Sequence, residues 1–242
     1  MSDFSTLKES SLHSTLKKIY AYQNDGQTEV ELNNHIYDIV TKENEIIEIQ
    51  NQNLNHLLPK IKDTIEKGMK IKVVHPVIVT KHIELYDKDK NLIKRTKSPV
   101  KGCIYSIFKE LKGIYPVLLE KSFTLEVPFI TITEIRIQED LPVQSENKLR
   151  RFKRNWNKQN KKLNEILEAK TFKCREDYLS LLPSELPQEF YSKDLEKALK
   201  EAKMPARIYK NANLILWVFH KMKLIELTKT EKRRKYYKIK QT

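Results

Sequence analysis

The sequence predicts an α/β (α+β) fold in which helices flank a mixed sheet and a smaller, mainly helical unit follows. Three observations lead to this prediction. Three short strand-like runs separated by polar turns lie within residues 28–50. Apolar residues recur at helical spacing before and after these runs. Residues 171–242 then favour helices followed by a β-hairpin. The length of 242 residues allows one large domain or two smaller ones.

Residues 1–140 are expected to form the α/β domain. Within residues 5–22, Leu12, Leu16 and Ile19 form the apolar stripe of a first helix. The expected strands are residues 28–32, 35–40, 45–50, 69–79 and 123–137. The expected later helices are residues 54–68 and 103–114, with a hairpin of charged tip between them at residues 81–97.

Residues 141–170 differ in composition from the preceding part. They are polar at first and then strongly basic, with Phe152 and Trp156 among the basic residues. We expect a linker that leads into a basic helix. Such a helix would follow a nucleic-acid backbone, and the alternative is a solvated surface helix.

Residues 171–242 are expected to form a winged helix-turn-helix. Residues 192–202 favour a helix with Ser192 as its N-cap. Residues 204–223 favour one short and one longer helix, and residues 224–240 favour a hairpin with a basic tip. Helices in this order followed by a hairpin are typical of the winged fold, whose recognition helix contacts DNA.

The charge of the chain favours a polyanionic partner. There are 46 Lys and Arg residues against 32 Asp and Glu, which gives a formal net charge of +14. Nucleic acid is the first candidate for such a chain. The alternative is biased composition, because Lys, Asn and Ile are all plentiful, as in AT-rich genomes. Double-stranded DNA is the predicted partner, while RNA and a homodimer remain open.

Cysteine usage and hydropathy bear on the compartment. Cys103 and Cys174 do not form a C-x-x-C pair, so neither a zinc site nor a disulfide framework is predicted. The N-terminus lacks the apolar stretch of a signal peptide. The longest apolar run, residues 214–219, is far too short to cross a bilayer. We therefore expect a cytoplasmic protein with no membrane partner.

The stretch YDIVTKENEIIEIQNQ, residues 37–52, places carboxylates in apolar strands. If residues 42–44 form the loop, Asp38 lies directly opposite Glu48, with Cβ atoms about 4.5–5.5 Å apart. Neighbouring residues are apolar on both faces, so we expect both sides to be covered. Two such carboxylates would repel each other unless a hard cation such as Mg²⁺ bound between them. The carbonyl of Ile49 is a further candidate ligand. The alternative is an edge hairpin with its carboxylates in water.

A helix that bears an acid, followed by a hairpin reading D-x(9)-E-x-Q, resembles the PD-(D/E)XK nuclease superfamily. Asp38 matches the first acid of the family motif and Glu48 the second. Glu9 matches an acid that the family often carries on its first helix. The resemblance covers residues 5–137 and includes the order of the elements.

Two positions depart from the family pattern. Tyr37 stands where a proline usually precedes the first acid, and Gln50 stands where the Lys is expected. Some restriction endonucleases of the superfamily carry Gln there. Because Gln50 has no charge, a nearby cation is expected to replace the missing one. The candidates are Lys81, Lys97 and Lys101.

The resemblance implies a restriction-endonuclease-like core that hydrolyses phosphodiester bonds with one or two metal ions. Asp38 and Glu48 would bind Mg²⁺, for which Mn²⁺ would substitute. Glu9 would complete the metal shell, and Gln50 would orient the water or contact the phosphate. The implied activity is that of a Mg²⁺-dependent endodeoxyribonuclease acting in restriction, repair, recombination or defence.

Basic residues outside the core are the candidates for DNA contacts. They are Lys97, Lys101, Arg150, Arg151, Arg154, Lys210, Asn213, Lys232, Arg233 and Arg234, with Asn213 as the one neutral member. Two other functions remain open. One is a catalytically inactive DNA-binding regulator, which Gln50 favours. The other is a winged-helix module that binds protein.

Overall fold

The computed structural model describes residues 11–145 and 148–241, and the chain divides into two compact units. Unit 1 consists of Met1–Lys42, Pro76–Cys103 and Val127–Ala169. Unit 2 consists of Glu43–His75, Ile104–Glu126 and Lys170–Thr242. Strands and helices occur in both units, and the strands pair in both parallel and antiparallel fashion. The predicted α/β (α+β) class with a mixed sheet flanked by helices is therefore confirmed, while the division at residues 140 and 170 stays a prediction.

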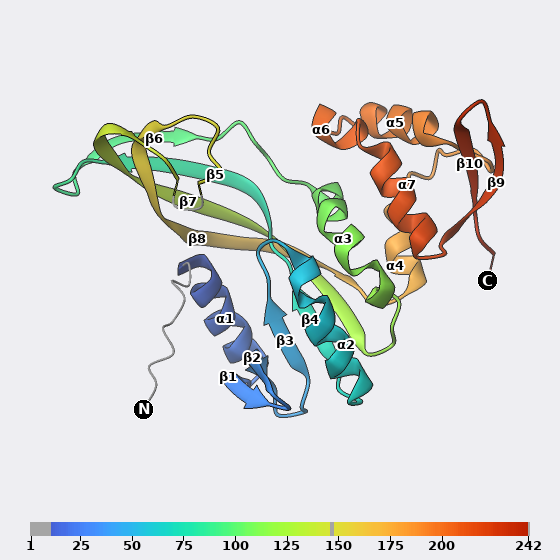
Figure 1. The fold of residues 1–242 in the computed structure, drawn as a ribbon, viewed down its shortest axis with the longest axis horizontal. Coiled ribbons are helices and arrows are strands. Elements are labelled where there is room, and N and C mark those ends of the chain that lie inside the picture. Colours follow the sequence, from blue (N-terminus) through green and yellow to red (C-terminus); the bar gives the residue numbers. More distant parts are fainter. Residues whose placement is uncertain (1–10, 146–147, 242) are drawn as a thin grey trace. The chain divides into compact units, whose positions relative to one another are not determined.

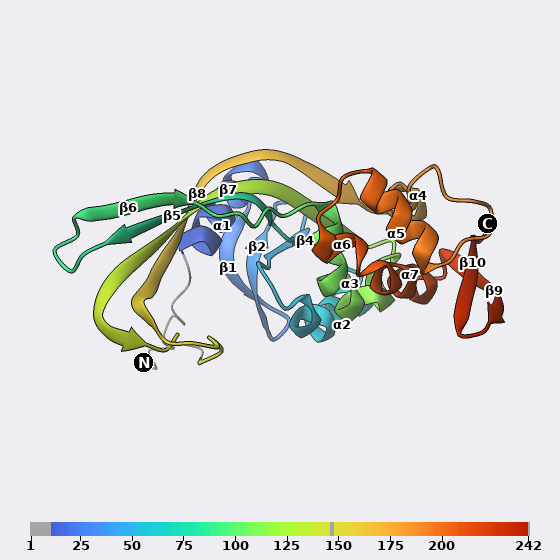
Figure 2. The same ribbon diagram turned by 90° about the horizontal axis from the view of Figure 1, so that it is seen from above.

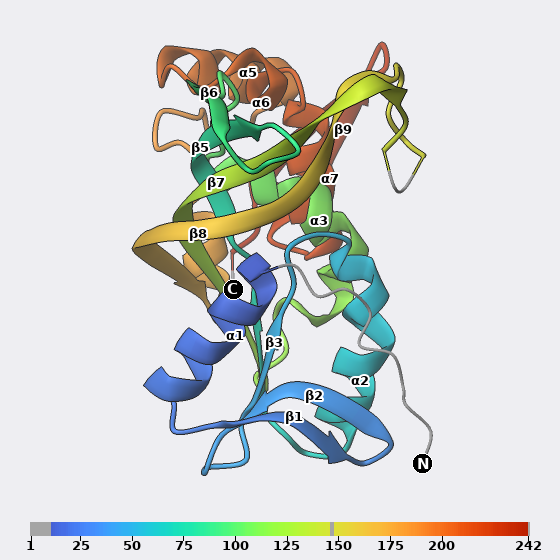
Figure 3. The ribbon, with the colours of Figure 1, turned by 90° about the vertical axis from the view of Figure 1, so that its left-hand side faces the viewer.

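Unit 1 begins with a helix that covers a hairpin. Helix α1 (Ser11–Gln23) buries Leu12 and Leu16, as the apolar stripe predicts. It lies beside β1 (Gln27–Leu32) and β2 (His35–Val40), which pair antiparallel (Figure 3). Asn33 and Asn34 form the turn with φ of 54° and 66°. Asn tolerates this left-handed conformation, which two-residue hairpin turns require.

The rest of unit 1 is a ribbon of long strands. Strand β5 (Val77–Tyr86) pairs antiparallel with β6 (Leu92–Lys97) and parallel with β7 (Phe123–Val143). Strand β8 (Arg154–Phe172) runs beside β7, as Figure 2 shows. The predicted charged hairpin between β5 and β6 is confirmed. The first residues of β7, up to Glu126, belong to unit 2.

The prediction of a basic helix in this part of the chain is wrong, because the structure forms strand β8 there. Lys and Arg have good intrinsic helix propensity, but that preference is weak and is routinely overridden by tertiary pairing. The second half of β7 offers a long row of backbone partners, and β8 satisfies them. Most side chains of β8 remain exposed, which suits a basic and polar sequence.

The prediction of one continuous strand at residues 69–79 is also wrong, because the structure has two strands there, β4 (Ile71–Val74) and β5. Pro76 lies at the break and has no N–H to donate to a sheet ladder. The sequence HP at this point therefore separates one strand in unit 2 from another in unit 1.

The sheet of unit 2 is parallel and buried. Strand β3 (Ile46–Ile49) pairs with β4, which pairs with the first residues of β7. Every residue of β3 is buried. The crossover from β3 to β4 consists of the 3₁₀ turn η1 (Leu54–Leu57) and helix α2 (Leu58–Glu66), as parallel strands require. Pro59 lies in the first turn of α2, where its missing N–H costs nothing.

The C-terminal part of unit 2 contains the expected helices and hairpin (Figure 1). They are α5 (Ser192–Glu201), α6 (Ala206–Tyr209), α7 (Ala212–Lys221), β9 (Ile225–Glu231) and β10 (Arg234–Ile239), preceded by the unpredicted α4 (Arg175–Leu179). Phe219 of α7 packs on Phe108 of α3 (Phe108–Ile114), with ring centroids 5.4 Å apart. The described residues also form the 3₁₀ turns η2 (Ile104–Ile107) and η3 (Tyr115–Val117).

The N-cap of α5 is one residue earlier than expected. Tyr191 has the extended backbone of an N-cap, and its N–H donates to the Asp194 carboxylate at 2.9 Å. Ser192 is therefore the first residue inside the helix. Among the described helices, none is long and apolar enough to cross a membrane.

Candidate active site

Asp38 lies in β2 of unit 1, on a strand that is covered on one side. Tyr37 and Ile39 are fully buried, whereas Ile36 is 67% exposed. The Asp38 side chain itself is 20% exposed. The expectation that both faces are covered is therefore wrong for β2, because its outer face meets solvent. Asp38 points from the half-open face, where a carboxylate costs less to hold than in the core.

Two basic side chains of α1 stand beside Asp38. His13 Nε2 lies 3.4 Å from Asp38 Oδ2, and Lys17 Nζ lies 4.0 Å from Oδ1. Lys17 is buried and also lies 2.9 Å from Glu29 Oε1 on β1. The helix that packs on the hairpin thus delivers positive charge to the first acid of the motif. The position of His13 next to the apolar stripe of the first helix was the available signal in the sequence.

Glu48 lies in β3 of unit 2 and is buried. Its side chain is 6% exposed, in register with Val73 on β4. Lys60 Nζ on α2 lies 2.6 Å from Glu48 Oε1, and the Lys60 side chain is 18% exposed. The expectation that β3 is covered is confirmed, since all four of its residues are buried. Desolvating two charges costs several kcal/mol per ion, so a charged pair in this place needs a reason other than stability.

Lys60 is the residue that sequence reasoning missed. It precedes buried Ile61 and lies one helical turn before buried Thr64, whose hydroxyl donates to the Lys60 carbonyl at 2.7 Å. A lysine within the apolar stripe of an amphipathic helix is therefore the feature of the sequence that could have pointed to Lys60. No fixed spacing from Glu48 marks it, because the loop and the 3₁₀ turn between them set the distance.

Gln50 and Ile49 follow Glu48 at the end of β3. Gln50 Nε2 donates to the Gln52 carbonyl at 2.8 Å, so its amide is held by its own loop. The Gln50 carbonyl lies 2.7 Å from Nδ1 of His75. Ile49 is buried and in register with Val74. The structure thus keeps the second acid and the Gln position on one short segment of unit 2.

Burial lowers the pKa of His75 below its ordinary value of 6.5, although its hydrogen bond to the Gln50 carbonyl and the charge of Glu110 raise it. The unfolded chain binds a proton at this position below about pH 6.5, whereas the folded chain binds it only at lower pH. The free energy of unfolding therefore decreases as the pH falls below 6.5, until the pH has passed the lowered pKa of His75.

We accordingly expect the melting temperature of the wild type to fall between about pH 7 and about pH 5 more than that of a His75→Asn variant. Asn keeps a donor for the Gln50 carbonyl but does not titrate. Differential scanning fluorimetry in matched buffers measures both slopes, and equal slopes would contradict the assignment.

The lysines proposed to replace the missing cation lie elsewhere in unit 1. Lys81 Nζ lies 3.3 Å from the Glu134 carboxylate on β7, so it is part of an ion pair. Lys97, at the end of β6, and Lys101, in the loop after it, are exposed. Glu9 lies outside the described residues.

A family model for a domain of unknown function, DUF8091, matches residues 10–173, which is more than half of the chain. The chain belongs to the DUF8091 family. An uncharacterized protein of Treponema pallidum (strain Nichols) is 27% identical over 190 residues, which cover 78% of this chain and 72% of that protein. No solved structure matches the chain. The DUF8091 match extends over α1 to β8 and thus includes Asp38, Glu48 and Lys60.

The described residues of the DUF8091 region offer oxygen donors suited to Mg²⁺. Within residues 11–145 and 148–241, no three His, Cys, Asp or Glu side chains gather to hold a metal ion. Mg²⁺ commonly uses only one or two carboxylates and keeps several waters. Asp38 and Glu48 fit that donor set, while their joint coordination of one ion stays a prediction because they belong to different units.

Apart from Lys97 and Lys101, the candidate DNA contacts fall into two groups. On the β7–β8 ribbon, Arg151 and Arg154 are exposed, and Arg150 packs on the Trp156 ring. In the C-terminal part, Lys210 and Asn213 are exposed at the start of α7, beyond the DUF8091 match. The exposed tip of the β9–β10 hairpin consists of Lys232, Arg233 and Arg234. Each group presents cations to solvent, as backbone phosphate contacts require.

Proposed function

We propose that the chain is a Mg²⁺-dependent DNA endonuclease of the PD-(D/E)XK type. The observation that carries the proposal is the ion pair between buried Glu48 and Lys60, 2.6 Å apart in unit 2. Glu48 is the second acid of the D-x(9)-E-x-Q motif, and Lys60 supplies beside it the positive charge that Gln50 lacks. A buried acid on a strand paired with a lysine from the adjacent helix is weak evidence for a stabilising role and marks a candidate functional site.

The order of the elements supports the same proposal. Helix α1, the antiparallel strands β1 and β2, strand β3, helix α2 and strand β4 follow one another along the chain. Strand β4 then pairs parallel with β3. This is the order on which the resemblance to the nuclease superfamily rests.

In the proposed reaction, the carboxylates of Asp38 and Glu48 are the groups that would bind Mg²⁺. When bound, the ion would lower the pKa of a water molecule and stabilise negative charge on the scissile phosphate. Lys60 fixes the Glu48 carboxylate and adds positive charge at the phosphate. Gln50 orients water through its amide, which can donate and accept hydrogen bonds. It does not act as a general acid or base, because the amide does not titrate. His13 holds the Asp38 carboxylate in position.

The C-terminal helices and hairpin would hold the DNA as a winged helix-turn-helix. Helix α7 exposes Asn213, Trp217 and Lys221 along one stripe, and the hairpin tip is basic. A catalytically inactive DNA-binding regulator is the second candidate, because Lys60 and His13 already stand beside the two acids. A protein-binding role of the winged unit is the third, since Trp217 is 40% exposed on α7.

The test is cleavage of supercoiled plasmid DNA by the full chain. We expect nicking or linearisation with Mg²⁺ or Mn²⁺ and none with EDTA. Asp38→Asn should lower the rate about a hundredfold, because it removes a charged ligand while keeping the side-chain shape. Asp25→Asn is the control, since that carboxylate is 75% exposed beside Lys42. Cleavage that survives EDTA, or equal rates for the two variants, would refute the proposal.

A further inference from the structure

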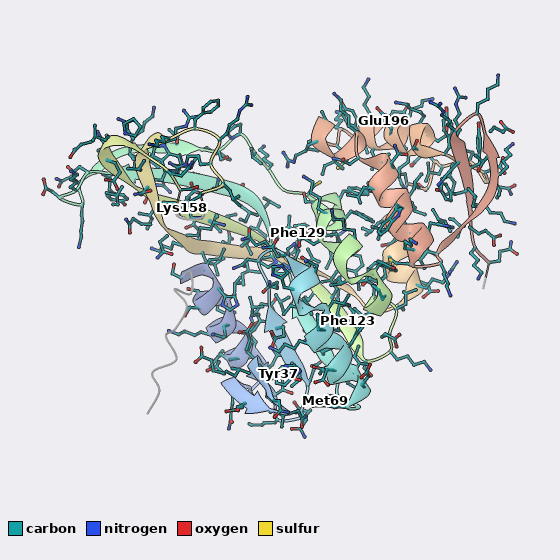
Figure 4. The ribbon with its side chains drawn as sticks, viewed as in Figure 1. Tyr37, Met69, Phe123, Phe129, Lys158 and Glu196 are labelled. Atoms are coloured by element: carbon teal, nitrogen blue, oxygen red, sulfur yellow. The ribbon has the colours of Figure 1, made fainter. Side chains whose placement is uncertain are left out.

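A basic pocket of about 380 Å³ lies within unit 1, on the ribbon of long strands. Lys81 of β5, Arg136 of β7 and Lys158 of β8 line it, and Lys158 is labelled in Figure 4. Arg150 and Trp156 line it as well. The volume falls within the range of small-molecule sites, roughly 300–1,000 Å³. None of these residues takes part in the proposed cleavage step, although Arg150 is also a candidate DNA contact. The ion pair of Lys81 with Glu134 holds Lys81 in the pocket wall.

Positive charge exceeds negative charge in this pocket. Glu134 is the one acidic residue among those that line it, and its carboxylate is already engaged. Arg136 donates to Glu134 Oε1 through Nε at 2.8 Å and through Nη2 at 2.5 Å, and Lys81 Nζ lies 3.3 Å from Oε2. Although burial would raise the pKa of Glu134, the hydrogen bonds from Arg136 and the charge of Lys81 hold it below its ordinary value. The carboxylate thus anchors two of the cations, Arg136 and Lys81.

The aromatic wall of the pocket is fixed in place. The guanidinium carbon of Arg136 lies 3.6 Å from the Trp156 ring centroid, and that of Arg150 lies 4.2 Å from it. Arg150 Nη1 also donates to the carbonyls of Val143 and Trp156, each at 3.2 Å. Guanidinium groups held by stacking and backbone hydrogen bonds lose little freedom when they bind an anion.

Lys161 of β8 is a further cation that interacts with the charges lining the pocket. Burial lowers the pKa of Lys161 below its ordinary value, and the charge of Lys158 lowers it again. The charge of Lys81 acts in the same direction, while that of Glu134 opposes it. Cations that repel one another at a half-buried site favour an anion that neutralises them.

We propose that this pocket is a binding site for a phosphate group carried on a molecule of about nucleotide size. Arg150 and Lys158 bind the phosphate oxygens, since a guanidinium offers two parallel donors and an ammonium a point charge. The organic part occupies the remaining volume beside Trp156. The phosphate belongs either to a free nucleotide or to the end of a nucleic-acid strand. The proposal does not depend on the cleavage activity, because it concerns binding alone.

The chain offers a direct optical test, because Trp156 and Trp217 are its two tryptophans. A Trp217→Phe variant of the full chain leaves Trp156 as the single tryptophan reporter. We expect adenosine 5′-monophosphate to change its fluorescence saturably and inorganic phosphate to compete. Adenosine should bind at least about tenfold more weakly than the monophosphate, because it lacks the charged group. A 5′-phosphorylated trinucleotide that binds more tightly than the monophosphate identifies a strand end as the source, and the reverse order identifies a free nucleotide.

Two charge-neutralising variants make the test specific. Lys158→Gln in the single-tryptophan background should weaken monophosphate binding about tenfold, because one charge-assisted contact is lost. Lys162→Gln is the matched control, since Lys162 is exposed on the same strand and does not line the pocket. Its affinity should stay within about twofold of the parent. The proposal is overturned if neither monophosphate nor trinucleotide changes the fluorescence, if adenosine binds equally well, or if the two variants weaken binding alike.

Discussion

Replacing Glu48 with glutamine is expected to lower Mg²⁺-dependent cleavage about a thousandfold, since a metal ion contributes several kcal/mol and each 1.4 kcal/mol is a factor of ten. Glutamine keeps the shape of the side chain and one oxygen, so the loss reports the charge. Single-turnover cleavage of a labelled duplex measures it without interference from product release.

The same substitution is expected to destabilise unit 2. It removes the carboxylate that stands 2.6 Å from the Lys60 ammonium, which is 18% exposed. Breaking a buried ion pair from one side costs about 3 kcal/mol, whereas replacing both partners is close to neutral. A double variant, Glu48→Gln with Lys60→Met, should therefore recover most of the stability and none of the activity.

Glu45→Gln is the matched control for this experiment. Glu45 directly precedes β3, its side chain is 30% exposed, and it lies 3.9 Å from Lys72 in a looser pair. We expect it to cleave at nearly the wild-type rate. A folded Glu48→Gln variant that cleaves as fast as Glu45→Gln would remove Glu48 from the site. A double variant that regains both stability and activity would reduce the pair to a structural feature.

The local pattern of the sequence was sufficient for the elements around the acids. Alternation in residues 35–40, the Asn33 and Asn34 turn, and the apolar run at β3 are decided by neighbouring residues along the chain. Each was predicted correctly within a residue or two. The apolar stripe of α1 was sufficient in the same way, since Leu12 and Leu16 need only one face to pack on.

Strand β8 could not be predicted on this basis. Its sequence, rich in Lys, Asn and Glu, has no strict alternation and a weak helical preference. What makes it a strand is the preceding strand β7, whose backbone groups need partners. The break at Pro76 is a different case from β8, because the proline that signals it is visible in the sequence. The Val and Ile residues on either side of Pro76 favoured the prediction of one continuous strand.

In the proposed site, the sequence motif singled out the two acids. Asp38 and Glu48 both lie in the short stretch of residues 37–52, but the cations beside them come from other elements. His13 and Lys17 reach Asp38 because α1 packs on the hairpin, and Lys60 reaches Glu48 because α2 crosses beside β3. Lys81 was a reasonable candidate by its position after an apolar strand, yet its partner is Glu134, far along the chain.

Replacing Lys60 with methionine is expected to lower cleavage by a few hundredfold, because removing one preorganised donor to the developing charge costs a factor of about 10²–10³. Methionine keeps the length of the side chain and is at home in the apolar stripe of α2. Lys62→Met is the control, since Lys62 is exposed on the same helix and should leave the rate unchanged.

A second substitution, at position 50, should then restore the positive charge that Lys60→Met removes. Side chains two residues apart on a strand share a face, so a lysine at position 50 would project on the same side as Glu48. Gln50→Lys in the Lys60→Met background is expected to restore at least about tenfold of the lost rate, because the charge returns to the position that the family motif assigns to it. Gln50→Lys alone should change the rate little, since one cation is already present. If Lys60→Met cleaves within twofold of the wild type, or if Gln50→Lys fails to rescue a folded Lys60→Met variant, Lys60 does not replace the motif lysine.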